Sequence, residues 1–110
     1  MPTGLNEIIR MYIEQVKISL GKDFDNAVLY GSCARNEYTK DSDVDIAIFT
    51  EVPASDFYKL ADKISESTFE FSVKHDIMLS PVFVNVDEYR RMLKVLPYYQ
   101  NIHKEGIAIG

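Results

Sequence analysis

Residues 27–49 read AVLYGSCARNEYTKDSDVDIAIF. Two apolar runs enclose a polar segment in this stretch. The first run, residues 27–30, is short and ends at a glycine, which is typical of a buried strand. The second run, residues 43–49, alternates polar and apolar residues before it becomes wholly apolar, which predicts a central strand. The segment between them predicts a helical turn over residues 32–36 and a loop over residues 37–42.

Helical patterns flank these two strands. Apolar residues at steps of three and four over residues 5–16 predict a helix with one buried face, and Gly21 is a natural end for it. The same spacing over residues 57–71 predicts a second helix. Asp87 is a candidate cap for a third helix, which we expect to end before Pro97.

The remaining strands complete a small sheet. A third strand is expected over residues 76–84, where Pro81 lacks an N–H group and therefore favours an edge position or a bulge. Residues 107–109 predict a further short strand. The order of elements indicates an α/β (α+β) fold, with a small mixed sheet and helices packed on one face.

Length and charge limit the functions that this chain can perform. Its 110 residues are sufficient for one domain, and its net charge of -5 argues against direct binding of nucleic acid through a basic surface. Cys33 is the one cysteine, and the sequence contains no spacing typical of a zinc site. We expect a cytoplasmic protein, because neither a secretory leader nor a membrane segment is recognisable.

Asp43 and Asp45 are the first candidate functional residues. Two positions apart on a strand, their side chains point to the same face, with Cα atoms roughly 7 Å apart. Two neighbouring carboxylates repel each other unless a cation lies between them, and Mg²⁺ prefers such oxygen ligands. The spacing alone favours two solvent-facing strand residues, because acids alternating with aliphatic residues are common on half-exposed strands.

Gly31 and Ser32 supply the complementary half of a phosphate site. They follow a strand and open a helical turn, where backbone N–H groups are free to bind phosphate. A phosphate-binding turn beside two carboxylates is suited to metal-assisted phosphoryl or nucleotidyl transfer. Asp76, at the expected start of the third strand, is the candidate third acid; the alternatives are an acid at a helix end or in a loop, or a functional His75.

The chain resembles the minimal nucleotidyltransferases, including the MNT-type antitoxins, of the DNA polymerase beta-like nucleotidyltransferase superfamily. The motifs Gly31-Ser32-x-Ala34-Arg35 and Ser42-Asp43-x-Asp45 have the spacing of that family. Residues 76–78 are similar to its third acid at a strand start, and residues 102–107 to the end of such domains. The chain departs from the pattern at Asn36, where many relatives have glycine.

This resemblance implies a polymerase beta-like fold, with residues 1–110 forming a single minimal nucleotidyltransferase domain. The nucleotide-binding residues that it implies are Gly31, Ser32, Arg35 and Ser42. The catalytic and metal-binding residues that it implies are Asp43, Asp45 and Asp76. In the implied reaction, these acids bind two Mg²⁺ ions, Asp76 activates an acceptor hydroxyl, and AMP is transferred from ATP with release of pyrophosphate.

The resemblance also implies a partner. Domains of this kind are often paired with a small all-helical HEPN-type protein as a toxin–antitoxin module, in which the antitoxin transfers AMP to the toxin or simply masks it. Transfer to a small molecule such as an aminoglycoside is a third reading. The acceptor, the nucleotide base and any homo-oligomer are left open by the sequence.

Two residues of the motif have structural roles as alternatives to functional ones. Arg35 either contacts phosphate or pairs with Glu37 or Asp41 at the surface. Cys33 is expected to be a small packed residue, not a nucleophile.

Overall fold

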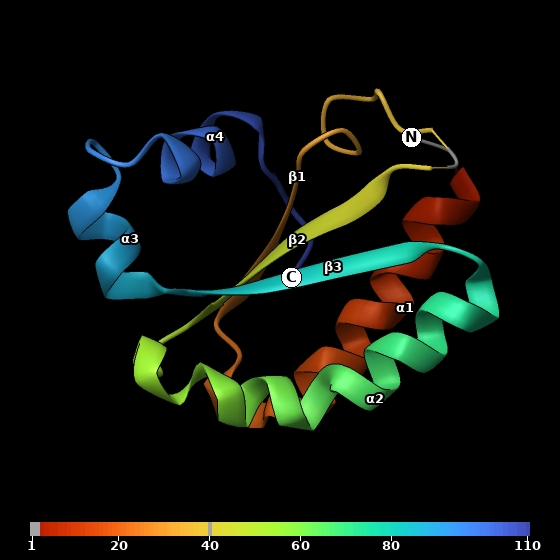
Figure 1. The fold of residues 1–110 in the computed structure, drawn as a ribbon, viewed down its shortest axis with the longest axis horizontal. Coiled ribbons are helices and arrows are strands. Elements are labelled where there is room, and N and C mark those ends of the chain that lie inside the picture. The colour runs from red at the N-terminus through yellow and green to blue at the C-terminus, as the bar shows by residue number, and fades with distance from the viewer. Residues whose placement is uncertain (1–2, 40) are drawn as a thin grey trace.

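A computed structural model describes residues 3–39 and 41–110 (Figure 1). The first half contains a long helix, α1 (Thr3–Leu20), a 3₁₀ turn, η1 (Gly21–Asp23), and two strands, β1 (Asn26–Tyr30) and β2 (Asp43–Thr50). The second half contains η2 (Ala54–Asp56), α2 (Phe57–His75), β3 (Met78–Asn85), α3 (Val86–Met92), α4 (Pro97–Glu105) and β4 (Ile107–Ala108). Among the described residues, no helix is both long and apolar enough to cross a membrane.

The strands form one mixed sheet in the order β3-β2-β1-β4. β1 is antiparallel to both β2 and β4, whereas β2 and β3 are parallel and connected through α2. The mixed sheet and the central position of β2 confirm the predictions. Pro81 lies in the edge strand β3, opposite Ile46 of β2, so the predicted edge position is also confirmed.

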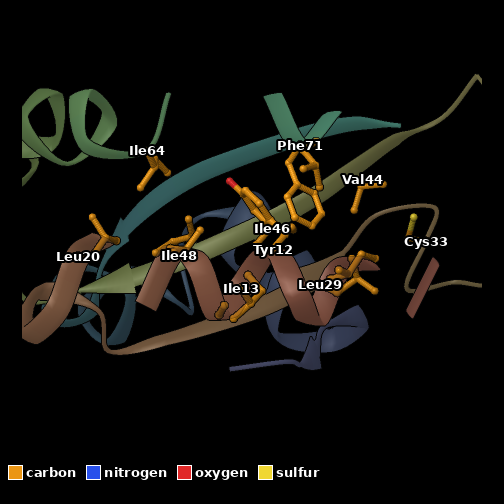
Figure 2. Packing of buried hydrophobic residues seen from close by; sticks show 14 of the residues in the cluster. Tyr12, Ile13, Leu20, Leu29, Cys33, Val44, Ile46, Ile48, Ile64 and Phe71 are labelled. Atoms are coloured by element: carbon orange, nitrogen blue, oxygen red, sulfur yellow. The ribbon is translucent and has the colours of Figure 1, made fainter. Parts of the chain in front are cut away.

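The larger core lies between the sheet and the two long helices, α1 and α2. Figure 2 shows Tyr12 of α1 beside Phe71 of α2 and above Ile46 and Ile48 of β2. The rings of Tyr12 and Phe71 are 5.7 Å apart, and the Tyr12 hydroxyl makes a 2.8 Å hydrogen bond with Thr68. Burial of these apolar helix faces is the main source of stability in a domain of this size.

The opposite face of the sheet is covered by the short helices α3 and α4 (Figure 1). A second core cluster there consists of Ala47, Phe49, Val84, Val86 and Ile102. The prediction of helices on one face thus describes α1 and α2, whereas α3 and α4 pack on the other. The reason is that the second half of β2 is apolar on both faces, so both faces must be covered.

Two local predictions were wrong. Asp76 precedes β3, which begins at Met78. α3 is capped by Asn85, whose side chain accepts a 2.9 Å hydrogen bond from the Glu88 N–H, and Asp87 lies inside the helix. The expected end of the third helix before Pro97 is confirmed, since α3 ends at Met92, and Pro97 itself occupies the first turn of α4, where its missing N–H costs nothing.

Candidate active site

A polar pocket of about 450 Å³ lies where β1 ends and β2 begins. Six of the seven predicted site residues line it, and Asp76 does not. The pocket is formed by Tyr30, Gly31, Ser32, Arg35, Ser42, Asp43, Asp45, Tyr98, Asn101 and Glu105. Its volume is within the range of small-molecule sites.

Asp43 and Asp45 form the floor of this pocket. They occupy alternate positions of β2, on the same face as Ala47 and Phe49, which is the face that α4 covers. Neither carboxylate belongs to an ion pair among the described residues. Burial, and then the charge of Asp43, raise the pKa of Asp45, while Arg35 acts in the opposite direction. Two unpaired carboxylates that disfavour each other's charge fit a divalent cation.

Gly31 is required for the close packing of this floor. Its φ angle of 73° lies in the left-handed region. A Cβ atom at this position would overlap the Oδ2 atom of Asp45, so a side chain there would displace the carboxylate. The sequence places Gly31 in a phosphate-binding turn, and the close contact that the structure shows for this glycine is with Asp45.

The turn after Gly31 leaves backbone donors free. The N–H groups of Arg35 and Glu37 donate to the carbonyl groups of Gly31 and Ser32, at 3.1 and 2.8 Å, which closes the predicted turn. Among the described residues, no acceptor is assigned to the N–H groups of residues 32–34. These three donors are suited to binding an anion.

Ser42 closes the loop that joins the turn to β2. Its hydroxyl accepts a 3.1 Å hydrogen bond from the Thr39 N–H and lies 3.0 Å from the Thr39 hydroxyl. Its own N–H donates to the Thr39 carbonyl at 3.0 Å. Ser42 lines the pocket, and its hydrogen bonds indicate that it also fixes the loop preceding Asp43.

Arg35 lies at the edge of the pocket between two acids. Its Nη1 atom is 3.0 Å from Glu105 and its Nε atom is 3.4 Å from Glu37. The pairing with Glu37 that the sequence suggested is present, and Glu105 of α4 adds a contact that sequence reasoning missed. Glu105, ahead of Glu37, raises the pKa of Arg35, which stays charged.

Asp76 lies outside the polar pocket. It lines a neighbouring hollow of about 250 Å³ together with Asp41 and Asp43. Its φ angle of 53° ends α2 in the left-handed conformation, and its N–H bonds to carbonyl groups of the last helical turn. The residues of β3 that pair with Asp43 and Asp45 are Met78 and Ser80, which carry no charge.

The acids are not gathered into one three-ligand cluster. Within residues 3–39 and 41–110, no group of three or more His, Cys, Asp or Glu side chains is close enough to hold a metal ion. Asp76 thus has a clear structural role as a helix end, which was one of the alternatives left open by the sequence. A role in the chemistry remains a prediction.

Sequence reasoning missed the second wall of the pocket, which α4 supplies. Tyr98, Asn101 and Glu105 lie at positions i, i+3 and i+7 and therefore share one face of α4. The Tyr98 hydroxyl makes a 2.6 Å hydrogen bond with Tyr30, across an edge-to-face contact of their rings. The spacing of these polar residues could have predicted that they share one helix face, but only if α4 itself had been predicted.

Cys33 is buried below the turn, as expected. Burial, and then the charge of Asp45, raise the pKa of its thiol to about 11. The thiol is therefore protonated near neutral pH, and Cys33 is a packing residue instead of a nucleophile.

Comparison with known proteins agrees with this geometry. The sequence pattern of the "Nucleotidyltransferase domain" family matches residues 11–107. The chain is 29% identical over 104 residues to "Putative protein adenylyltransferase MJ0141" of Methanocaldococcus jannaschii, covering 94% of this chain and 96% of that protein.

Solved structures share the fold at lower identity. A nucleotidyltransferase structure from Sulfolobus solfataricus superposes with a TM-score of 0.59 at 17% identity, covering 94% of this chain and 77% of that one. A toxin–antitoxin structure with AMP-PNP gives 0.55 at 16% identity, covering 92% and 72%. A double Asp-to-Glu mutant of the toxin–antitoxin complex MntA-HpeT gives 0.54 at 14% identity, also covering 92% and 72%.

The family pattern covers most of the chain, and its motif residues form one pocket. The chain therefore belongs to the nucleotidyltransferase domain family and is a nucleotidyltransferase.

Proposed function

We propose that this protein is a Mg²⁺-dependent nucleotidyltransferase that moves AMP from ATP to a hydroxyl group of a partner protein. The observation that carries the proposal is the arrangement of the polar pocket. Asp43 and Asp45, which have no ion-pair partner among residues 3–39 and 41–110, lie against a glycine turn in which no acceptor within those residues is assigned to the N–H groups of residues 32–34. In this arrangement the carboxylates are suited to the metal ion of a metal–triphosphate complex, and the N–H groups are suited to its phosphates.

The residues present fit Mg²⁺. Asp43 and Asp45 would hold it, and we propose Asp76 as a third acid that acts from the neighbouring hollow, which Asp43 also lines. When bound, Mg²⁺ would neutralise phosphate charge and so favour attack at phosphorus. We propose that two ions bind, as the resemblance to the minimal nucleotidyltransferases implies.

The chain's own residues would orient the nucleotide. The N–H groups of residues 32–34 and the Ser32 hydroxyl would bind the triphosphate, with Ser42 fixing the loop beside it. Arg35 would release its ion pairs with Glu37 and Glu105 and bind phosphate oxygens instead, which a guanidinium binds well.

The proposed transfer has one bond formed and one broken at the α-phosphorus. The acceptor oxygen forms a bond to this phosphorus, the bond to the bridging oxygen of the β-phosphate breaks, and pyrophosphate leaves with the electron pair. The proton of the acceptor hydroxyl passes to a carboxylate, for which Asp76 is the candidate. The products are an AMP-modified acceptor and pyrophosphate.

The acceptor we propose is a small, all-helical HEPN-type toxin, for which this chain would be the antitoxin. Support comes from the name of the Methanocaldococcus relative, "Putative protein adenylyltransferase MJ0141", and from two structural neighbours that are toxin–antitoxin complexes. We also propose that residues 1–110 act as one domain in the cytoplasm, where a chain with a single buried cysteine needs no disulfide.

Labelling from α-labelled ATP tests the transfer. With Mg²⁺ and a purified HEPN-type partner, the wild-type chain should label the partner, and chelation of Mg²⁺ should abolish labelling. The double variant Asp43→Asn/Asp45→Asn should lose at least about a hundredfold in rate, since it lacks the charges that hold the metal. The matched control is Asp62→Asn/Glu66→Gln on the exposed face of α2, which should label at the wild-type rate. Equal labelling by the two double variants would refute the proposal.

A masking antitoxin is the second candidate, because the two toxin–antitoxin neighbours were solved as complexes. Neutralisation of the toxin separates the two functions. If the Asp43→Asn/Asp45→Asn variant still neutralises at equal stoichiometry, masking is sufficient. If neutralisation disappears together with labelling, catalysis is the function.

A further inference from the structure

Under the proposed function, the face of α4 that closes the polar pocket is assigned no phosphate or metal contact. It presents Tyr98, Asn101 and Glu105. Under the proposed function, triphosphate and metal occupy the opposite wall, which is made by the turn after β1 and the start of β2. The nucleoside part of the substrate must then extend along the wall that remains, and that wall is α4.

The position of α4 is firmly fixed. Ile102, on the face turned toward the sheet, is 2% exposed within the second core cluster. The Gly106 N–H bonds to the Ile102 carbonyl at 2.9 Å, and β4 then pairs with β1. A Cβ atom at Gly106 would overlap the Ile102 carbonyl and the Val28 side chain, so the end of α4 is tightly packed. Side chains on a rigid helix can discriminate between ligands.

Asn101 is the unused polar side chain of this wall. Glu105 is paired with Arg35 at 3.0 Å, and the Tyr98 hydroxyl is bonded to Tyr30 at 2.6 Å. Among the described residues, the Asn101 amide makes no hydrogen bond, although it lines the pocket. It therefore offers one donor and one acceptor side by side to a ligand.

Tyr98 places an aromatic ring beside this amide. The ring is 45% exposed and makes contacts with the rings of Tyr30 and Tyr99, at 5.9 Å each. Its hydroxyl is already bonded, so the ring itself is what remains for a ligand. Aromatic rings stack on nucleobases of any kind, whereas an amide distinguishes between them.

We propose that Asn101 selects the nucleobase and that its preferred base is adenine. An amide donates to N7 and accepts from the N6 amino group of adenine, which is a bidentate match. Guanine presents two acceptors, O6 and N7, at the same edge, so the amide oxygen would face O6 without a hydrogen bond. This inference rests on the proposed function, because it places the triphosphate on the opposite wall.

Calorimetric titration with ATP, GTP and inorganic tripolyphosphate, each with Mg²⁺, tests the proposal. The wild-type chain should bind ATP about tenfold more tightly than GTP. Asn101→Leu, which keeps the shape and removes both hydrogen-bonding groups, should reduce this preference to within twofold and leave tripolyphosphate binding unchanged. The matched control is His103→Leu, at an exposed position of α4 outside the pocket, which should keep the wild-type preference.

The outcomes separate this inference from the proposed function. A wild-type chain that binds tripolyphosphate but does not prefer ATP, or an Asn101→Leu variant that keeps the preference, overturns the role of Asn101 alone. A wild-type chain that binds none of the three ligands overturns the phosphate site as well. Thermal unfolding should be the same for wild type and Asn101→Leu, because this exposed side chain makes no described contact that would be lost.

Discussion

Two hollows of the described residues have similar sizes and opposite chemistry. The polar pocket has a volume of about 450 Å³, and a larger hollow of about 570 Å³, here called the apolar groove, lies between α2 and β3. The apolar groove is lined by Ala61, Ile64, Ser65, Thr68, Phe69, Ser72, Val73, Asp76, Ile77, Met78, Leu79, Pro81 and Phe83. It contains one carboxylate, whereas the polar pocket contains three together with an arginine. Volume therefore does not identify the site of chemistry in this fold.

The two hollows have different structural origins. The apolar groove follows an edge of the sheet, where α2 covers β3 from one side and leaves Phe69 70% and Met78 62% exposed. The polar pocket lies on the opposite face of the sheet, where a strand end, a turn and a helix meet. Converging backbone ends supply unpaired N–H groups and charges, whereas the groove at the sheet edge is lined mainly by apolar side chains.

Substitution of Gly31 is expected to have the largest effect on the polar pocket. Gly31→Ala should lower nucleotidyl transfer by about a hundredfold, because its Cβ atom would displace the Asp45 carboxylate and its φ angle is positive. It should also cost about 1–3 kcal/mol of unfolding free energy. The measurements are the rate of labelling from α-labelled ATP and the urea midpoint.

Gly21 is the matched control for this substitution. Its φ angle of 56° is also positive, but a Cβ atom there would meet nothing within 4 Å. Gly21→Ala should therefore show a similar strain cost of about 1–2 kcal/mol with no loss of transfer. Equal rates for the two alanine variants would mean that the position of Asp45 does not matter.

Asp76 connects the two regions, because it lines the apolar groove and also the hollow shared with Asp43. Asp76→Gly suits the left-handed conformation, so the variant should be as stable as wild type or slightly more stable. If Asp76 accepts the proton of the acceptor hydroxyl, both Asp76→Gly and Asp76→Asn should lose about a hundredfold in kcat. Full activity in a stable Asp76→Gly variant would leave Asp76 as a helix end alone.

How far the sequence predicts this molecule depends on the range of the interactions involved. Residues 27–49 carry both strands, the turn and the paired acids within one local segment, and all of these are where the pattern predicts. Asp76 was predicted to start the third strand because an acid before an apolar run resembles a strand start. In the structure its backbone is left-handed and ends α2.

The wall formed by α4 depends on long-range contacts. It exists because Ile102 is buried against strands about 55 to 75 positions earlier in the chain. No local pattern reports such packing, and Pro97, which correctly indicated that the third helix ends before it, was not recognised as the start of α4. The half of the candidate site that we propose for phosphate and metal was therefore predictable, and the half formed by α4 was not.

The smallest expected effect concerns the mutual repulsion of the two acids. Burial and Asp43 raise the pKa of Asp45 in the folded state, so ionisation of this group destabilises the fold. In chelator, Asp45→Asn should be more stable than wild type near neutral pH, by no more than about 1 kcal/mol because solvent screens the pair. This difference should vanish as the pH falls below the ordinary aspartate pKa of about 3.9, where both states are protonated.

Urea unfolding between pH 3 and 8 measures this difference, with Asp62→Asn, an exposed acid of α2 outside the pocket, as the control. Addition of Mg²⁺ should reverse the order, because the wild type gains stability from a bound cation and Asp45→Asn does not. A stability difference that is independent of both pH and Mg²⁺ would show that Asp45 acts through packing on Gly31 instead of through its charge. The difference between the two hollows would then not include a metal site, because Asp43 and Asp45 would not bind a cation.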